Sequence, residues 1–359
     1  MLYHLLYPLY EQFIGFNVLR YVTFRTFGAL FTALAIYFIF GKPMISFLIR
    51  KRVWQTVRSD GPVNHIIDKR GTPTMGGILL WLSVIVSVLL WTRFDQLYVL
   101  IGLALAVGFA AIGLIDDYRK VVLKDAKGLR ARYKFPLQVM VALVVVLVLY
   151  DCLGSSTILS VPFFKNFQPD LGWYYYPFAV CVIVGASNAV NLTDGLDGLV
   201  SVPSIVAFFA YAGLAYIAGH MVIASYLTVP FVSGSGELTV MCGAIVGACL
   251  GFLWFNSQPA SVFMGDVGSL PLGATLGYVA LVTKNELLLL IIGGIFVLET
   301  ISVITQVVSF KLTKKRIFRM APLHHHFELK GWAESKVIVR FWIIAFVLAL
   351  ISLTTLKLR

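Results

Sequence analysis

The sequence predicts an all-α polytopic membrane protein with ten transmembrane helices, and three observations support this. Hydrophobic residues make up 59% of the chain and charged residues only 13%, with a mean hydropathy of +0.87, whereas soluble domains are about 25% charged. Apolar runs close to the about 20 residues that span a bilayer recur along the whole chain. Basic residues are dense in alternate loops, as the positive-inside rule requires.

Ten apolar runs are long enough to be read as transmembrane helices, and polar or turn-forming residues bound each of them. The runs 135–150 and 267–283 are the shortest, so their ends are defined by the fewest residues. In chain order the predicted spans are 24–49, 75–91, 97–115, 135–150, 173–190, 199–218, 238–255, 267–283, 287–310 and 337–356.

The loops between these spans differ sharply in charge. Segment 50–72 carries six Lys and Arg, 116–136 carries seven and 311–336 carries seven, which is 20 of the 29 in the chain. The loops of opposite parity hold only Arg93, Lys165 and Lys284. We therefore expect the basic loops, and with them the short loops 191–198 and 256–266, to face the cytoplasm, and both termini to lie outside.

The organisation of the chain indicates one membrane domain over residues 1–359. No loop is long enough for a separate soluble domain, and no internal repeat is visible in the sequence. The N-terminus lacks the basic flank, apolar core and small-residue cleavage site of a cleaved signal peptide. The net charge of +12 is explained by the inside-positive loops, so we expect a membrane lipid environment and no nucleic-acid partner.

Two adjacent carboxylates, Asp116 and Asp117, end the third predicted span. An Asp at the centre of a bilayer costs about 2.5–3.5 kcal/mol, so a pair near its edge favours a function. Neighbouring side chains on a helix point about 100° apart. One carboxylate can therefore contact a cation or phosphate while the other accepts a proton. The alternative is an interfacial stop signal before the basic residues Arg119 and Lys120.

Four polar side chains recur at every third position where the fifth span ends, namely Asn188, Asn191, Asp194 and Asp197. This spacing keeps neighbouring groups on roughly one side of a helix, and more strictly so in a 3₁₀ turn. Gly195 lets a backbone or a ligand approach closely. The alternative is an Asx-rich turn between two spans, but four amides and acids in register favour a binding site.

Asp266 stands at the start of the eighth span between Gly265 and Gly268. Free backbone amides and a carboxylate converge at such a position. The side chain alone would be explained by a helix cap. Mg²⁺ takes one or two carboxylates together with phosphate oxygens and water. Three acid clusters on one face of the membrane therefore predict a site for Mg²⁺ and a diphosphate.

Three successive histidines, His324, His325 and His326, lie in the last basic loop after Arg316 and Arg319. On a helix their side chains diverge by about 100° per residue, so they cannot all bind one metal ion. Histidine can carry a proton or contact a phosphate, and arginine suits phosphates. A transition-metal site is the alternative, but no Cys lies close and the acids elsewhere are typical of a hard-cation site.

The first basic loop supplies Lys69, Arg70 and Thr74, followed by glycines that precede the second span. Cations and a glycine-rich turn before a helix are compatible with anion binding, although the pattern is not specific. The lysines and arginines of 119–134 have a simpler interpretation as inside-positive membrane anchors.

Four motifs in register carry a family resemblance. The segments DDYRK at 116–120, NAVNLTDGLDG at 188–198, FMGDVGS at 263–269 and APLHHHFE at 321–328 resemble those of the polyprenyl-phosphate N-acetylhexosamine-1-phosphate transferases. The triple histidine after Ala-Pro, together with GTPTMGG at 71–77, is similar to the phospho-N-acetylmuramoyl-pentapeptide transferase branch. The resemblance runs in order and spacing from about residue 15 to the C-terminus.

The resemblance implies a reaction and its setting. It implies transfer of phospho-N-acetylmuramoyl-pentapeptide from its UDP conjugate to undecaprenyl phosphate, with Mg²⁺ as cofactor, to give lipid I and UMP in peptidoglycan synthesis. It further implies ten helices around a cytoplasm-facing active-site cleft in the bacterial cytoplasmic (inner) membrane, and a homodimer.

The resemblance also implies roles for single residues. Asp266 would bind Mg²⁺, Asp116 would contact the lipid phosphate, and Asp117 would be its structural or metal-proximal partner. His324 would contact the diphosphate or assist proton transfer, with His325 and His326 on the nucleotide side. The implied uridine pocket comprises Gly195, Leu196, Asp197, Asn256 and Phe263, and the implied polar lining comprises Lys69, Thr74, Asn188, Asn191, Asp194 and Gln306.

Three alternatives remain open at this point. A sister transferase would use UDP-N-acetylglucosamine, against which the His324–His326 run argues. A proton-coupled transporter would use Glu299 in the ninth span as proton carrier, whereas the simpler account of Glu299 is a membrane-embedded acid bonded to neighbouring helices. A two-step path through an Asp-phosphosugar intermediate is an alternative to direct transfer.

Overall fold

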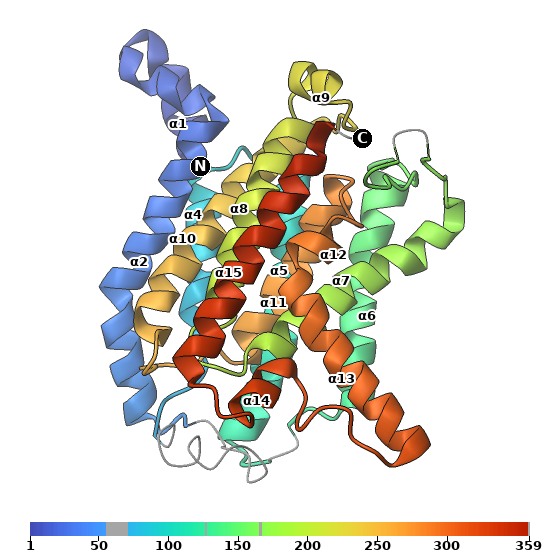
Figure 1. Cartoon of the computed structure of the whole chain (residues 1–359). Coiled ribbons are helices and arrows are strands. Elements are labelled where there is room, and N and C mark those ends of the chain that lie inside the picture. Colours follow the sequence, from blue (N-terminus) through green and yellow to red (C-terminus); the bar gives the residue numbers. More distant parts are fainter. Residues whose placement is uncertain (55–70, 126–127, 165–166, 358–359) are drawn as a thin grey trace.

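The chain folds into a bundle of apolar helices (Figure 1). The computed structural model describes residues 1–54, 71–125, 128–164 and 167–357. The principal helices are α2 (Val22–Arg50), α4 (Gly77–Trp91), α5 (Leu97–Val121), α6 (Ala131–Leu147), α7 (Tyr175–Thr193), α8 (Ser201–Ala218), α10 (Leu238–Asn256), α11 (Asp266–Val282), α13 (Gly294–Thr313) and α15 (Glu334–Thr354). Within these ranges eight helices are long and apolar enough to cross a membrane, and α4 and α11 are shorter apolar helices. The prediction of an all-α polytopic membrane protein is confirmed.

Each predicted apolar run corresponds to a helical segment, with two differences. The run predicted at 135–150 is longer, because α6 begins at Ala131 and is continued by a π-helical turn, η3 (Val148–Cys152). The run predicted at 287–310 is broken at Gly293 into a short helix, α12 (Leu289–Ile292), and α13. The smaller elements are α1 (Leu2–Leu6), η1 (Tyr7–Glu11), η2 (Ile14–Arg20), η4 (Gly172–Tyr174), α9 (Met221–Leu227), η5 (Ser235–Glu237), α14 (Leu323–Glu328) and η6 (Thr355–Lys357).

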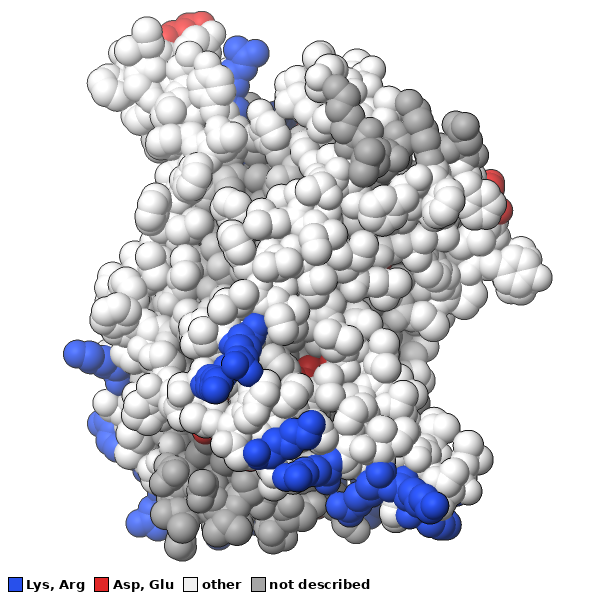
Figure 2. All heavy atoms as spheres, viewed as in Figure 1, with Lys and Arg blue, Asp and Glu red and all other residues white. Residues whose placement is uncertain are grey.

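The two ends of the bundle differ in charge. α1, α9 and the end of α15 lie at one end, and α14 lies at the other (Figure 1). Lys and Arg gather at the end that carries α14, whereas the middle of the visible face is nearly free of charge (Figure 2). We call the α14 end the basic end. Its charge is the asymmetry that positive-inside topology produces.

Helices α4 and α11 are short because their first residues follow loops that pair with each other inside the protein. The amides of Gly76 and Gly77 donate to the carbonyls of Phe263 and Met264, both at 2.9 Å, and Phe263 N–H donates to Pro73 C=O at 2.8 Å. Irregular backbone at membrane depth is tolerated only where protein covers it and satisfies its hydrogen bonds. This pairing places the start of both helices, and therefore Asp266, inside the bundle.

Glycines set the closest helix contacts. A Cβ at Gly247 of α10 would lie 2.0 Å from the carbonyl oxygen of Leu30 in α2, and one at Gly273 of α11 would lie 2.3 Å from that of Ala186 in α7. Small residues allow this backbone approach between membrane helices. At the opposite end from α14, Arg25 of α2 forms a buried two-point ion pair with Glu237, at 2.5 and 2.6 Å. The helices of the N- and C-terminal halves are thus interleaved.

Candidate active site

Three aspartates from two helices converge toward the basic end of the bundle. Asp116 and Asp117 lie in the last turns of α5, and Asp266 is the first residue of α11. One carboxylate oxygen of each lies within 4.8 Å of the others. Gly113, one turn before Asp116, makes this possible, because a Cβ there would be only 2.2 Å from the carbonyl oxygen of Asp266. Helices α5 and α11 are therefore in backbone contact at the site.

Backbone amides orient two of the three carboxylates. The amide of Val267 donates to Oδ2 of Asp117 at 3.0 Å, and the amide of Leu129 donates to Oδ1 of Asp116 at 2.5 Å. Gly265 has φ +75°, and a Cβ there would lie 2.6 Å from Oδ2 of Asp117. Only glycine satisfies both the left-handed conformation and this close approach. The turn before α11 is thus shaped around Asp117.

Two lysines bridge the aspartates. Nζ of Lys120 in α5 lies 2.6 Å from Asp116 and 3.1 Å from Asp266. Nζ of Lys134 in α6 lies 3.0 Å from Asp116 and 2.5 Å from Asp266. Both ammonium groups therefore sit between carboxylates of different helices, and buried charges require such pairing. The sequence interpretation of these lysines as membrane anchors missed this contact, although the i,i+4 spacing of Asp116 and Lys120 was a signal for it.

The donor set fits a hard divalent cation. Carboxylate oxygens are the ligands that Mg²⁺ takes from proteins, usually with phosphate oxygens and water completing the shell. The three oxygens come close enough to share one ion. The side chains of Lys120 and Lys134 are 32% and 16% exposed, so neither lysine is sealed off from an incoming anion.

The Asn188 to Asp197 motif ends α7 beside the aspartates. Oγ of Ser269, one turn into α11, donates to Oδ1 of Asn191 at 2.6 Å. Nδ2 of Asn188 donates to Oε1 of Gln138 in α6 at 2.8 Å, and Asp194 is the C-terminal boundary residue of α7. The motif therefore connects α7 to the two helices that carry Asp266 and Lys134.

Thr74 lies at the same place. It is buried, and its Oγ1 would be 3.2 Å from a Cβ at Gly265, which places it next to Asp117. Its amide donates to the carbonyl of Val53 at 3.0 Å. Lys69, predicted from the same loop, lies outside the described residues.

The turn after α7 is held by side chains predicted for a uridine pocket. Asn256 accepts from the amide of Gly198 at 2.9 Å and donates to Val262 C=O at 2.8 Å, while Asp197 accepts from the amide of Ala260 at 3.0 Å. Both amide ends of Asn256 are thus engaged within the fold. The side chain of Leu196 packs in an apolar cluster with α15, and Phe263 lies in the loop paired with Pro73.

The three histidines contact three different partners. His324 is buried, and its Nδ1 lies 3.1 Å from Oε1 of Glu299. Nδ1 of His325 lies 2.7 Å from Glu328, and Nδ1 of His326 accepts from the amide of Arg319 at 3.0 Å. Within the described ranges the clustered metal-type ligands are the three aspartates and not the histidines. The divergence expected on a helix is observed.

Partial burial, with Lys330 and Arg319 nearby, lowers the pKa of His326 below its ordinary 6.5. A neutral ring is the form whose Nδ1 can accept a hydrogen bond. Gln306, predicted for the polar lining, accepts from the amides of Ile317 and Phe318, both at 3.0 Å. Gln306 and His326 therefore both fix the loop before α14, and the described contacts do not bring them to the aspartates.

Comparison with known proteins adds independent findings. The family model described as glycosyl transferase family 4 matches residues 99–284, and a phospho-N-acetylmuramoyl-pentapeptide-transferase signature matches residues 69–79. A phospho-N-acetylmuramoyl-pentapeptide-transferase of Desulforapulum autotrophicum is 57% identical over the full length of both chains. Proteins of the same name from Syntrophus aciditrophicus and Desulfotalea psychrophila are 55% and 54% identical, again over both full lengths.

The chain belongs to the phospho-N-acetylmuramoyl-pentapeptide transferase family. The family resemblance read from the motifs is confirmed, and a transferase replaces the transporter alternative. As a phospho-N-acetylmuramoyl-pentapeptide transferase, the chain is a multi-pass membrane enzyme of peptidoglycan synthesis. The simpler account of Glu299, an acid bonded to a neighbouring helix, is confirmed, and its partner in this transferase is the histidine helix α14.

Proposed function

We propose that the chain catalyses Mg²⁺-dependent transfer of phospho-N-acetylmuramoyl-pentapeptide from its UDP conjugate to undecaprenyl phosphate, giving lipid I and UMP. The observation that carries this proposal is the cluster of Asp116, Asp117 and Asp266, bridged by Lys120 and Lys134 near the basic end. The reaction exchanges one phosphoanhydride for another, so catalysis depends mainly on charge neutralisation and alignment. The aspartates can bind the cation and the lysines can bind the phosphates, so the cluster provides both charge neutralisation and alignment.

The aspartates have distinct roles in this proposal. Asp266, with its neighbours Asp116 and Asp117, would hold Mg²⁺, which supplies charge neutralisation for the diphosphate and for departing UMP. Asp116, which faces both lysines, orients the lipid phosphate. A phosphate monoester has a second pKa of about 6, so most of it is already ionised at neutral pH and a base is needed only for the monoanionic fraction.

The nucleotide is proposed to bind along the turn after α7. The phosphates would contact Lys120, Lys134 and His324, and the lining of this side would comprise Lys69, Thr74, Asn188, Asn191, Asp194, Gln306, His325 and His326, with Gly195, Leu196, Asp197, Asn256 and Phe263 around uridine. The side chains of Asn256 and Leu196 are engaged in the fold. These two residues therefore contribute backbone and shape rather than free polar groups.

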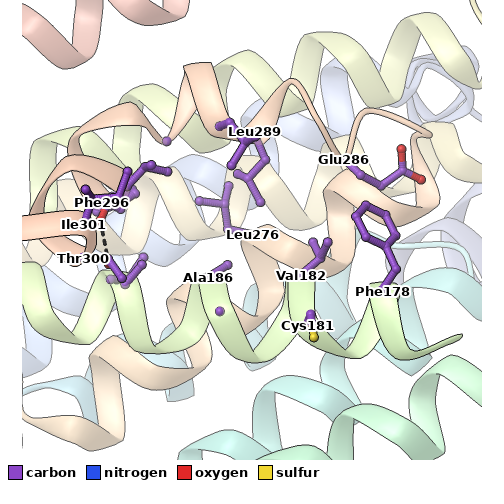
Figure 3. A pocket seen from close by; sticks show the side chains of 16 residues that line it. Phe178, Cys181, Val182, Ala186, Leu276, Glu286, Leu289, Phe296, Thr300 and Ile301 are labelled. Atoms are coloured by element: carbon purple, nitrogen blue, oxygen red, sulfur yellow. Dashed lines mark hydrogen bonds between the residues drawn. The ribbon is translucent and has the colours of Figure 1, made fainter. Parts of the chain in front are cut away.

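An apolar cavity of about 300 Å³ between α7, α11 and α13 suits the polyprenyl tail. Cys181, Val182 and Ala186 line it from α7, opposite Leu276 and Leu289 (Figure 3). Its lining on α7 runs from residue 178 to residue 190, which is about 18 Å of helix. Asn191 follows directly, so one end of the cavity adjoins the polar motif.

The setting is also proposed rather than established by these contacts. Asp116 and Asp117 lie in the last turns of α5, directly before the basic segment 119–134, and the relatives are bacterial, which supports a cytoplasm-facing site in the cytoplasmic membrane with both termini outside. Residues 1–359 form one membrane domain in this proposal, because helices from both halves of the chain pack together. A homodimer is expected from the resemblance, and cross-linking in membranes tests it.

The decisive experiment follows UMP release by purified full-length protein with undecaprenyl phosphate and either UDP-N-acetylmuramoyl-pentapeptide or UDP-N-acetylglucosamine. We expect release with the muramoyl substrate alone, loss of release in EDTA, and restoration by Mg²⁺. Asp266→Asn abolishes release. Asp95→Asn is the matched control, because Asp95 is exposed and its ion pair among the described residues is with the surface group Arg93 at 2.6 Å, an interaction worth about 0–1 kcal/mol.

Three results would contradict the proposal. Release with UDP-N-acetylglucosamine in place of the muramoyl substrate would assign the chain to the sister reaction. Full activity in EDTA would remove the cation from the mechanism. Equal activity of Asp266→Asn and Asp95→Asn would remove the acid cluster from the active site.

A further inference from the structure

Glu299 is a completely buried acid in the second turn of α13. Burying a carboxylate is costly unless hydrogen-bond donors surround it. Three donors come from α14: the amide of Leu323 at 2.6 Å, the amide of His324 at 3.3 Å, and Nδ1 of His324 at 3.1 Å. One carboxylate thus holds both the backbone and the ring of His324.

The contact with Glu299 determines which ring nitrogen carries the proton. An ionised carboxylate only accepts hydrogen bonds, so Nδ1 of His324 is the donor to an ionised Glu299. Nε2 of His324 is buried and has no hydrogen-bond partner among the described residues. It faces Gly195, where a Cβ would lie 2.3 Å from Nε2. The neutral ring therefore presents a lone pair toward the turn that follows α7.

We propose that Glu299 is the positioning residue for His324: it keeps Nδ1 protonated and directs the Nε2 lone pair to the phosphate-bearing substrates. This inference rests on the proposed transferase reaction. A monoanionic phosphate that meets Nε2 gives up its O–H proton, so that the O–H bond breaks, an Nε2–H bond forms and the phosphate becomes a dianion. The resulting imidazolium donates from Nε2 to a phosphate oxygen, while Glu299 balances its charge through Nδ1. The proton leaves on departing UMP.

Other ionisable groups near the ring do not duplicate this contact. His325 is next to it, with ring centroids 4.2 Å apart, but its Nδ1 is directed to Glu328 at 2.7 Å. Asp194 and Asp197 flank Gly195 on the facing turn, and Asp197 accepts from the amide of Ala260. Glu299 is thus the acid that contacts Nδ1 of His324.

A double-mutant cycle tests whether Glu299 acts through His324. With the full-length enzyme, we expect Glu299→Gln to lower kcat for UMP release by about 10–100-fold, as removal of a carboxylate that orients a histidine does in other sites, with little change in KM for the nucleotide. In the His324→Ala background, Glu299→Gln should cause no further loss. Glu237→Gln, which removes another buried paired carboxylate at the opposite end, controls for general destabilisation and should keep the wild-type kcat.

Multiplicative losses in the cycle, or a change in KM alone, would overturn the proposal, because a merely structural acid would act independently of His324. The wild-type protein provides a second test that needs no Glu299 variant. In ¹⁵N-histidine spectra, the resonance lost in His324→Gln should report a ring protonated at Nδ1, and an Nε2-protonated neutral ring would refute the assignment. This spectrum decides the tautomer of His324 whether or not the wild type releases UMP. A wild type that releases no UMP would refute the proposed reaction instead.

Discussion

The contact between α5 and α11 at Gly113 allows a sharp test of the acid cluster. A Cβ in Gly113→Ala would lie 2.2 Å from the carbonyl oxygen of Asp266, 2.5 Å from its carbonyl carbon and 2.6 Å from the amide of Val267. Ordinary contacts begin at 3.4 Å, so the helices must separate by 3.4 minus 2.2, or 1.2 Å. All three obstacles are backbone atoms, which no side-chain rotation can relieve.

The expected result is a large loss of activity with a moderate loss of stability. A displacement of about 1 Å costs about 100-fold in rate where reacting groups must align, and overpacking costs about 1–3 kcal/mol. Gly108→Ala on the same helix is the control, because its Cβ would meet Cγ1 of the Val141 side chain at 2.8 Å. Both variants gain about 1 kcal/mol of helix propensity, so the difference between them isolates the contact with Asp266.

The assay measures kcat for UMP release at saturating substrates and Mg²⁺, together with thermal unfolding in detergent. If Gly113→Ala retained activity within about threefold of Gly108→Ala, the two helices would not be in backbone contact at the site. The convergence of Asp116, Asp117 and Asp266 would then have to be abandoned.

Three further predictions follow from single contacts. Lys134→Gln should lower kcat by about 10–100-fold, the worth of a charge-assisted hydrogen bond. The same change should lower the Mg²⁺ concentration for half-saturation, because the ammonium that competes for Asp116 and Asp266 is gone. A higher Mg²⁺ requirement in a titration would contradict this. Gly185→Phe should raise KM for undecaprenyl phosphate by about tenfold, which corresponds to roughly two buried methylene groups. It should leave KM for the nucleotide unchanged, because Gly185 lines the apolar cavity. The control Gly213→Phe, at a position where a Cβ also meets nothing within 4 Å, should change neither KM value. The folded-state pKa of His326 lies below its ordinary value, so its stabilising contribution is present above about pH 6.5 and is lost as pH falls through the folded pKa. The hydrogen-exchange protection factors of residues 316–328, corrected for the intrinsic pH dependence of exchange, should fall at low pH in the wild type and not in His326→Asn, whose amide oxygen still accepts from Arg319. Equal responses of the two proteins would disprove the role of His326.

The helices of this protein could be predicted because a bilayer demands continuous apolar runs. Local composition thus predicted the ten apolar runs apart from their ends and the break at Gly293, but not the short helices α9 and α14. α6 began earlier than expected, because Lys134 lies near the start of this helix and is neutralised by Asp116 and Asp266. A sequence shows the charge but not the partner that lets it enter the bundle.

The candidate site was only partly predictable, for the same reason. Asp116, Asp117 and Asp266 were singled out because acids at span ends are costly, and the structure brings them together. Glu299 is bonded to a neighbouring helix, as its simpler account expected, but periodicity does not encode that the partner is His324, 25 residues away. Asn256 was predicted to contact the ligand, but its amide oxygen bonds to Gly198 and its amide nitrogen to Val262, so its side chain connects two loops.

The charge of the bridged acid cluster bears on the order in which cation and substrate bind. With all three aspartates ionised, the charges of the cluster sum to −3, and Lys120 and Lys134 bring the sum to −1. A site of that sign repels a nucleotide diphosphate and attracts a divalent cation, which changes the sum to +1. In that fully ionised state the site favours substrates that arrive after, or together with, their cation.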